Sequence, residues 1–282
     1  MNCAWDMVLN LVPISMRKTV DKFSADLVQE LRLRSGQKAE LIVKNKSIWL
    51  EHTVLKEDVQ FCVNIASRYS PGSSATSSYG YITSAGGHRL GLCGQAVINN
   101  GKMTGFRSIT SICIRVARDI REIAQDAAAF DGSYLILGRP GSGKTTLLRD
   151  LIRYLSQDNN VAVVDEREEL FPILNGSHCF STGRKMDIIY GCSKTSGIEM
   201  MLRTMNPDYI AIDEVTAEED CNGLLHAGWC GVKLIATAHA DSKYDLFKRP
   251  IYRPLVESGL FNNLLILQPD KSWRWERMSQ CC

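Results

Sequence analysis

The feature that most restricts how this chain can fold is a glycine-rich segment enclosed by two apolar runs. Residues 138–145 read GRPGSGKT, with YLIL before them and the apolar stretch TTLLRDLI from residue 145 onward. The segment matches the pattern G-x-x-x-x-G-K-[ST]. A buried strand that passes through such a loop into a helix is a building unit of parallel α/β sheets. We therefore expect an α/β domain in the second half of the chain.

The residue types in this segment suit a phosphate ligand, although the pattern alone also fits a structural glycine turn. Glycines let the backbone curl around an anion, and the helix start adds the positive end of its dipole. We expect Lys144 to contact the β- and γ-phosphates and the Thr145 hydroxyl to ligate Mg²⁺, so the predicted cofactors are ATP and Mg²⁺. The expected nucleotide-binding residues are Gly138, Arg139, Pro140, Gly141, Ser142, Gly143, Lys144, Thr145 and Thr146.

Two carboxylates follow another apolar run, residues 209–212 (YIAI). We expect Asp213 to hold Mg²⁺ and Glu214 to act as the general base that polarises the attacking water. The alternative is a strand followed by an acidic helix start. A rival pair, Asp165 and Glu166, follows residues 161–164 (VAVV) in the same manner. We rank it second because it ends the second strand, whereas in P-loop ATPases with a catalytic glutamate the magnesium aspartate ends the third. The alternative role of Asp165 and Glu166 is a solvated loop.

A histidine follows a further predicted strand. Residues 234–238 end in ATA before His239. In P-loop ATPases with a catalytic glutamate this fourth strand lies beside the first, so its end faces the γ-phosphate at the carboxyl edge of the sheet. We expect His239 to join Lys144, Glu214 and the second-choice Glu166 as catalytic residues; the alternative is a histidine that satisfies a backbone group at a strand end.

The hydrophobic pattern divides the chain into two domains. The predicted first domain, residues 1–118, is a smaller α+β domain, and the second, residues 119–282, has a parallel sheet covered by helices on both faces. With its phosphate loop, this second domain resembles the RecA-like P-loop ATPase domains. In the first we expect helices at 25–34 and 58–69, a hairpin at 39–43 and 47–50, a loop at 70–80, and strands within 80–98 and at 109–116. In the second we expect a helical connection at 119–131, strands at 134–137, 161–164, 209–212, 234–238 and 264–267, and helices near 144–156, 198–205 and 217–228.

Composition narrows the environment and the partners. The net charge of +2 argues against a strongly electrostatic nucleic-acid binder, so no direct nucleic-acid partner is expected. The ten cysteines include no C-x-x-C pair, which favours reduced thiols in the cytoplasm. No apolar run approaches the roughly 18 residues that a membrane span needs. The first residues carry Asp6 and no basic start, so we expect no signal peptide; peripheral membrane association stays compatible with the sequence.

These motifs together resemble the secretion-type hexameric ATPases of type II and type IV systems, which carry an acidic box at residues 165–168 and a histidine box at His239. The chain resembles more closely the stage III sporulation AA family of spore-forming bacteria. The segments that carry this resemblance are 30–34, 89–94, 105–107, 114–118, 137–150, 164–167 and 187–192.

The resemblance implies an ATPase that acts in the mother-cell cytoplasm, at the membrane facing the forespore, on a mother-cell-to-forespore channel apparatus. It implies a ring-shaped homo-oligomer, expected to be a hexamer, and membrane-embedded sporulation channel proteins as partners. In secretion ATPases, arginines of the first domain or linker reach the phosphates. Arg107, Arg115 and Arg118 are the candidates here, with surface charges as their alternative role.

Two other functions stay open at this point. One is a nucleic-acid-dependent AAA-like ATPase, such as a loader or remodeller; the near-neutral charge weighs against it. The other is a nucleotide-binding switch or scaffold without turnover. The absence of an L-S-G-G-Q segment argues against a transporter cassette, and the absence of N-K-x-D argues against a GTPase.

Overall fold

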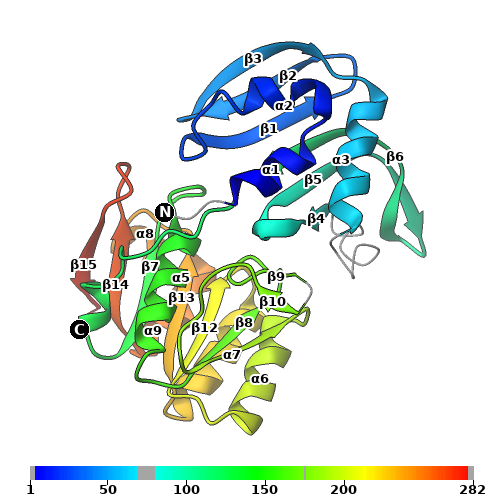
Figure 1. Cartoon of the computed structure of the whole chain (residues 1–282). Coiled ribbons are helices and arrows are strands. Elements are labelled where there is room, and N and C mark those ends of the chain that lie inside the picture. The colour runs from blue at the N-terminus through cyan, green and yellow to red at the C-terminus, as the bar shows by residue number, and fades with distance from the viewer. Residues whose placement is uncertain (1–3, 69–79, 175, 279–282) are drawn as a thin grey trace. The chain divides into compact units, whose positions relative to one another are not determined.

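The computed structural model describes residues 4–68, 80–174 and 176–278. The chain forms two compact units, coloured from blue to red along the chain in Figure 1. Unit 1 comprises Met1–Asp119 together with Pro172–Phe180, and unit 2 comprises Ile120–Phe171 and Ser181–Cys282. The boundary that we place between residues 118 and 119, as the division between two independently folding domains, stays a prediction. The segment Pro172–Phe180 is grouped with unit 1, whereas the predicted division into two consecutive domains assigns it to the second domain.

Unit 1 is built on a six-stranded sheet in the order β3-β2-β1-β6-β5-β4. All of its pairings are antiparallel. Its core lies between the sheet and helices, and contains Leu31, Leu33, Leu41, Val59 and Ile114. The elements of this unit are α1 (Trp5–Leu11), α2 (Ile14–Val20), β1 (Val28–Arg34), β2 (Lys38–Val43), β3 (Lys46–Thr53), α3 (Lys56–Arg68), β4 (Tyr81–Thr83), η1 (Ala85–Gly87), β5 (Arg89–Asn99), β6 (Lys102–Arg115), β9 (Ile173–Leu174) and β10 (Ser177–His178).

One secondary-structure prediction in this unit is wrong. Residues 25–34 were expected to be helical, but β1 occupies most of this segment and lies between β2 and β6. Leu31 and Leu33 are buried while Glu30, Arg32 and Arg34 are partly exposed, which is the two-residue period of a strand with one face on the core. The hairpin at 39–43 and 47–50 and the helix that α3 forms are confirmed; of the loop at 70–80, all but Gly80 lies outside the described residues.

Unit 2 is built on a seven-stranded sheet in the order β11-β8-β12-β13-β7-β14-β15. All neighbours are parallel except the last pair, β14 and β15. β13 lies beside β7, as expected for the fourth and first strands of this class. The elements are η2 (Ala127–Ala129), β7 (Ser133–Leu137), α5 (Lys144–Leu155), β8 (Val161–Asp165), β11 (Met186–Tyr190), α6 (Lys194–Thr204), β12 (Tyr209–Glu214), α7 (Glu218–Trp229), β13 (Lys233–Ala238), α8 (Lys243–Lys248), η3 (Pro250–Tyr252), α9 (Arg253–Glu257), β14 (Phe261–Leu267) and β15 (Trp273–Arg277).

The five predicted strands of this unit and its three predicted helices are present. The helical connection expected at 119–131 is not: among the described residues there, only Ala127–Ala129 is helical, as one 3₁₀ turn. The backbone N–H groups of Ile123 and Ala124 are instead held by the carboxylate of Asp150 on α5. Strands β11 and β15 were not predicted.

Helices cover both faces of the parallel sheet. Leu135 and Leu137 of β7 join one core cluster with buried residues of α6, α7 and α9. The alternate residues Tyr134 and Ile136 are equally buried but lie outside that cluster, as do the buried leucines of α5. Because successive side chains of a strand point to opposite faces, α5 covers the other face. This arrangement places the residue that follows each parallel strand at a common edge.

Helix α6 approaches the sheet closely at a glycine. A Cβ atom added to Gly197 would lie 2.4 Å from Val164 Cγ1 of β8, and the Val164 side chain is buried and β-branched. Alanine would ordinarily stabilise a helix interior by about 1 kcal/mol over glycine. Here we expect Gly197→Ala to lower the free energy of unfolding by about 1–3 kcal/mol, because Val164 has no room to move. Chemical denaturation measures it, with Met200→Ala on the exposed side of α6 as control. A Gly197→Ala protein more stable than wild type would contradict this packing.

Candidate active site

The phosphate-loop sequence connects β7 to α5 at the carboxyl edge of the parallel sheet. Gly141 has φ +74° and Gly143 has φ +106°, a region that residues with a Cβ atom rarely adopt. Gly138 is needed for a different reason, because an added Cβ would lie 2.4 Å from Ser142 Oγ and 3.2 Å from Leu267 Cβ. The loop therefore curls tightly and ends at Lys144, the first residue of α5.

Lys144 is buried and lies at the centre of the site. Its ammonium group donates to the carbonyl oxygens of Gly138 (3.0 Å) and Arg139 (3.1 Å) and to Nδ1 of His239 (3.0 Å). Burial lowers the pKa of Lys144, while the charges of Glu214 and Asp213 act in the opposite direction. The lysine thus brings a desolvated donor to the mouth of the loop, where an anion interacts more strongly than in water.

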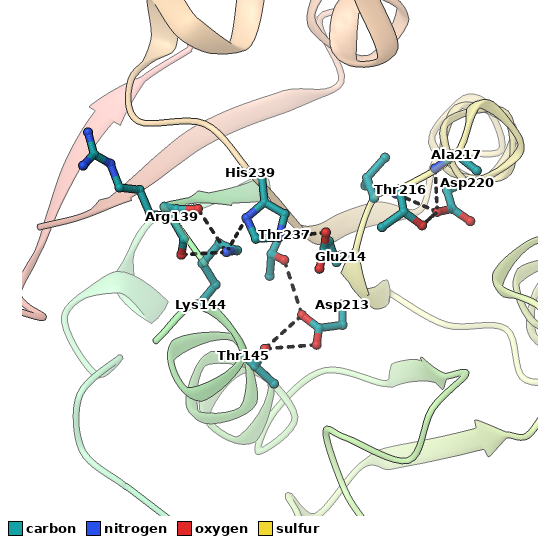
Figure 2. A network of polar contacts seen from close by, with 12 residues as sticks. Arg139, Lys144, Thr145, Asp213, Glu214, Thr216, Ala217, Asp220, Thr237 and His239 are labelled. Atoms are coloured by element: carbon teal, nitrogen blue, oxygen red, sulfur yellow. Dashed lines mark hydrogen bonds and ion pairs between the residues drawn. The ribbon is translucent and has the colours of Figure 1, made fainter. Parts of the chain in front are cut away.

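Asp213 is held by two hydroxyl groups from neighbouring elements (Figure 2). Thr145 Oγ1 donates to Asp213 Oδ2 at 3.0 Å, and Thr237 Oγ1 donates to Oδ1 at 3.3 Å. Burial raises the pKa of Asp213 despite both hydrogen bonds, and the carboxylates of Glu169 and Glu214 raise it further. A carboxylate in this position would be stabilised by a cation close to it.

Glu214 and His239 form the second contact of the site. Glu214 Oε1 lies 2.7 Å from His239 Nε2, and the other ring nitrogen faces Lys144 Nζ. An ammonium group has no lone pair, so Nδ1 must accept and Nε2 carries the proton that Glu214 accepts. One imidazole therefore links the lysine of the loop to the carboxylate at the end of β12. The sequence placed these three side chains at the site separately, and the structure brings them together (Figure 2).

Tyr252 was not identified from the sequence. Its hydroxyl accepts the backbone N–H of His239 at 3.1 Å and donates to the carbonyl of Val215 at 3.4 Å, and the residue is buried. It therefore fixes the backbone on both sides of the Glu214–His239 contact. Tyr252 lies in η3, 13 residues after His239, and no local pattern marks it.

Arg139, Pro140 and Gly141 of the loop are exposed. The guanidinium group of Arg139 is exposed and paired with Asp241 at 2.7 Å, pointing away from Lys144 in Figure 2. Thr146 is partly buried. Contacts of these residues with a nucleotide stay a prediction.

The rival acidic pair occupies the end of β8. The Asp165 carboxylate is buried and accepts the backbone N–H groups of Glu169, Leu170 and Phe171, each at 2.9 Å. These bonds fold the loop that follows β8. Burial nevertheless outweighs them and raises the pKa of Asp165 to about 6. Glu166 is half-buried and lies 3.4 Å from the ammonium group of Lys194.

The three candidate arginines belong to unit 1. Arg107 is exposed on β6, Arg115 lies 3.4 Å from Glu30, and Arg118 donates to the carbonyls of Ala25 and Val28. Their role towards a nucleotide stays a prediction.

The donor set fits a nucleotide with Mg²⁺. Ser142 Oγ, within the loop, is a buried polar atom with no hydrogen-bond partner, and such groups usually await a ligand or water. The hydroxyl of Thr145 and the carboxylate of Asp213 supply the oxygen ligands that Mg²⁺ prefers, next to an ammonium group suited to phosphate oxygens.

No other constellation of metal ligands is present: residues 4–68, 80–174 and 176–278 contain no group of three His, Cys, Asp or Glu side chains placed to hold a metal ion. All described cysteines are free thiols. In the same ranges each helix is too short or too polar to cross a bilayer.

The sequence and the fold both have counterparts among known proteins. The family model described as "Sporulation stage III, protein AA" matches residues 4–274. Stage III sporulation protein AA of Bacillus subtilis (strain 168) is 34% identical over an alignment of 279 residues, and the match covers 94% of this chain and 91% of that protein. Among solved structures, the ATPase DotB of Legionella pneumophila has a TM-score of 0.54 at 15% identity, covering 94% of this chain and 80% of that chain. The pilus retraction motor PilT with bound ADP has a TM-score of 0.61 at 12% identity, covering 91% and 80%. The predicted fold class is confirmed.

The raised pKa of Asp165 predicts a specific dependence of stability on pH. Because the folded pKa is about 6 and the ordinary value is 3.8, the folded protein binds this proton more tightly than the unfolded chain does. The resulting stability is fully present below pH 3.8 and is lost as the pH rises through about 6.

Relative to Asp165→Asn, we expect the free energy of unfolding of the wild type to fall by up to about 3 kcal/mol across that window. Chemical denaturation at several pH values measures it, with Asp158→Asn at an exposed position as control. A constant difference between wild type and Asp165→Asn from pH 4 to 7 would show that the three N–H bonds outweigh burial.

Proposed function

The chain belongs to the sporulation stage III protein AA family, and from this premise we propose that it is a Mg²⁺-dependent ATPase of the secretion-ATPase type. One observation carries the proposal: the single imidazole of His239 contacts both Lys144 Nζ and Glu214 Oε1 at the mouth of the phosphate loop. The imidazole ring therefore lies between Lys144, the proposed phosphate-binding cation, and Glu214, the candidate base. The names of the structural neighbours, an ATPase and a motor with bound ADP, support the proposed ATPase activity.

Each residue has a role that its contacts make feasible. Lys144 binds the terminal phosphates and can exchange its carbonyl contacts for phosphate oxygens. Thr145 and Asp213 would hold Mg²⁺, which when bound neutralises charge on the phosphate oxygens. Glu214 accepts a proton from the attacking water, and His239 orients it through the 2.7 Å contact.

The biological setting is proposed from the family. We infer a cytoplasmic ATPase of the mother cell, associated peripherally with the membrane facing the forespore, that drives or assembles a channel apparatus of membrane proteins. We infer a homo-oligomeric ring, expected to be a hexamer, from the resemblance of the phosphate-loop, acidic and histidine segments to those of the secretion-type hexameric ATPases. In such a ring the first-domain arginines are candidates for contacting nucleotide. Arg107, Arg115 and Arg118 are these candidates.

Lys144→Ala tests the phosphate-binding role. The variant removes the ammonium group that faces the loop carbonyls, so we expect nucleotide affinity to fall by about 10- to 100-fold and ATP turnover to be lost. Titration with a fluorescent ATP analogue and a phosphate-release assay measure the two effects. Lys248→Ala, at an exposed position on α8, is the control. Unchanged affinity in Lys144→Ala would remove the basis of the proposal.

Glu214→Gln separates binding from hydrolysis. Glutamine preserves the shape of the side chain but is not a base, so we expect nucleotide affinity near that of the wild type and kcat lower by about 10²- to 10⁴-fold. Measuring the molar mass of this variant with ATP tests the oligomer, because uncleaved nucleotide should hold any ATP-dependent assembly. If turnover survives here but is lost in Asp165→Asn with Glu166→Gln, the base lies in the other acidic pair.

A further inference from the structure

Lys194, which has no role in the proposed mechanism, lines the same cavity as Glu214. Lys194 is the first residue of α6, follows the N-cap Ser193, and is only 7% exposed. Both facts are unfavourable for a cation, because burial removes its hydration and the start of a helix carries positive partial charge. The lysine must therefore be stabilised by carboxylates.

Two carboxylates contact Lys194, and they are held to different degrees. The ammonium group lies 3.1 Å from Asp220 Oδ2 and 3.4 Å from Glu166 Oε2. Asp220 also accepts the N–H groups of Thr216 (2.9 Å) and Ala217 (3.2 Å), a set drawn in Figure 2. Asp220 thus keeps several donors if the lysine is removed. Glu166, with 35% of its side chain exposed, depends on the lysine for its pairing.

The same lysine faces a small cavity rich in carboxylates. The lining residues are Val164, Asp165, Glu166, Arg167, Glu169, Lys194, Asp213, Glu214 and Thr216. Five of these side chains are acids and two are cations. Asp165, Asp213 and Glu214 line this one cavity, so a further uncompensated carboxylate here would repel all three.

We propose that Lys194 is a positioning residue for ATP hydrolysis: it holds Glu166 in an ion pair so that Glu214 is the carboxylate presented to the phosphate loop. Its other partner, Asp220, accepts the N–H groups of Thr216 and Ala217, which follow Glu214 by two and three positions. Lys194 therefore connects the loop after β8 to the loop after β12. This inference rests on the proposed ATPase function and adds a residue that the function does not require by itself.

We expect the effect of removing the Lys194 charge to be reversed when the charge of Glu166 is removed as well. In Lys194→Met, Glu166 becomes an unpaired carboxylate beside Asp213 and Glu214. Like charges repel, so the acids should rearrange and Glu214 should leave its position against His239. In the double variant Lys194→Met with Glu166→Gln, the extra charge is gone while the cavity left by the lysine is the same. A merely structural role of Lys194 would not be reversed in this way.

The experiment compares wild type, Lys194→Met, Glu166→Gln and the double variant. We expect Lys194→Met to lower kcat about tenfold or more with a nucleotide dissociation constant within about threefold of wild type, and the double variant to recover most of the lost kcat. Without nucleotide, we expect Lys194→Met to lower Tm by roughly 5 °C and Glu166→Gln to restore about half of that loss. Lys243→Met is the matched control, because Lys243 is the first residue of α8 and faces the Phe247 ring at 6.0 Å.

Two outcomes would overturn the inference. If the double variant is no better than Lys194→Met in both kcat and Tm, the lysine acts through Asp220 or packing alone. If Glu166→Gln by itself abolishes turnover, Glu166 acts on the substrate and is not held aside. Failure of the proposed function looks different: wild type would show no ATP turnover, and the thermal comparison without nucleotide would still test the Lys194–Glu166 pair.

Discussion

The candidate site depends on the compensation of buried charge at one edge of the parallel sheet. Strands β8 and β12 end there in carboxylates, and α5 begins there with a buried lysine. Each of these groups needs a partner of its own, because an unpaired charge in the interior is strongly unfavourable. The partners come from elements far apart in the chain, so the site needs α5 and the neighbouring strands β7, β8, β12 and β13 in place.

The acids at this edge of the sheet have different hydrogen-bond and ion-pair partners, and these give them different roles. Asp165 accepts three backbone N–H groups and shapes a loop, whereas Asp213 accepts two hydroxyls and keeps its oxygens near the phosphate loop. Glu214 contacts an imidazole and Glu166 an ammonium group. Two acidic pairs that look alike in sequence therefore differ in chemistry, because the hydrogen-bond donors around them differ.

Sequence reasoning correctly predicted which side chains lie together where the pattern is local, while their roles stay predictions. The phosphate loop, Asp213 and Glu214 adjoin apolar strands, and the position of His239 followed from the expected neighbourhood of β13 and β7. It missed residues that contact the site from distant parts of the sequence. Tyr252 and Lys194 reach the site through tertiary contacts that no short pattern encodes. Residues 25–34 were misread because Leu27, Val28 and Leu31 have helical spacing, whereas the strand-like alternation of LRLR spans only four residues.

The grouping of Pro172–Phe180 with unit 1 has a consequence for how the backbone connects the two units. The chain leaves unit 2 after Phe171 and re-enters it at Ser181, in addition to the connection at residues 119–120. Three backbone crossings therefore join the two units, where a simple tandem arrangement has one. A cut of the chain between residues 119 and 120 would therefore not separate the two units, because the segment Pro172–Phe180 of unit 1 lies within the stretch that otherwise forms unit 2.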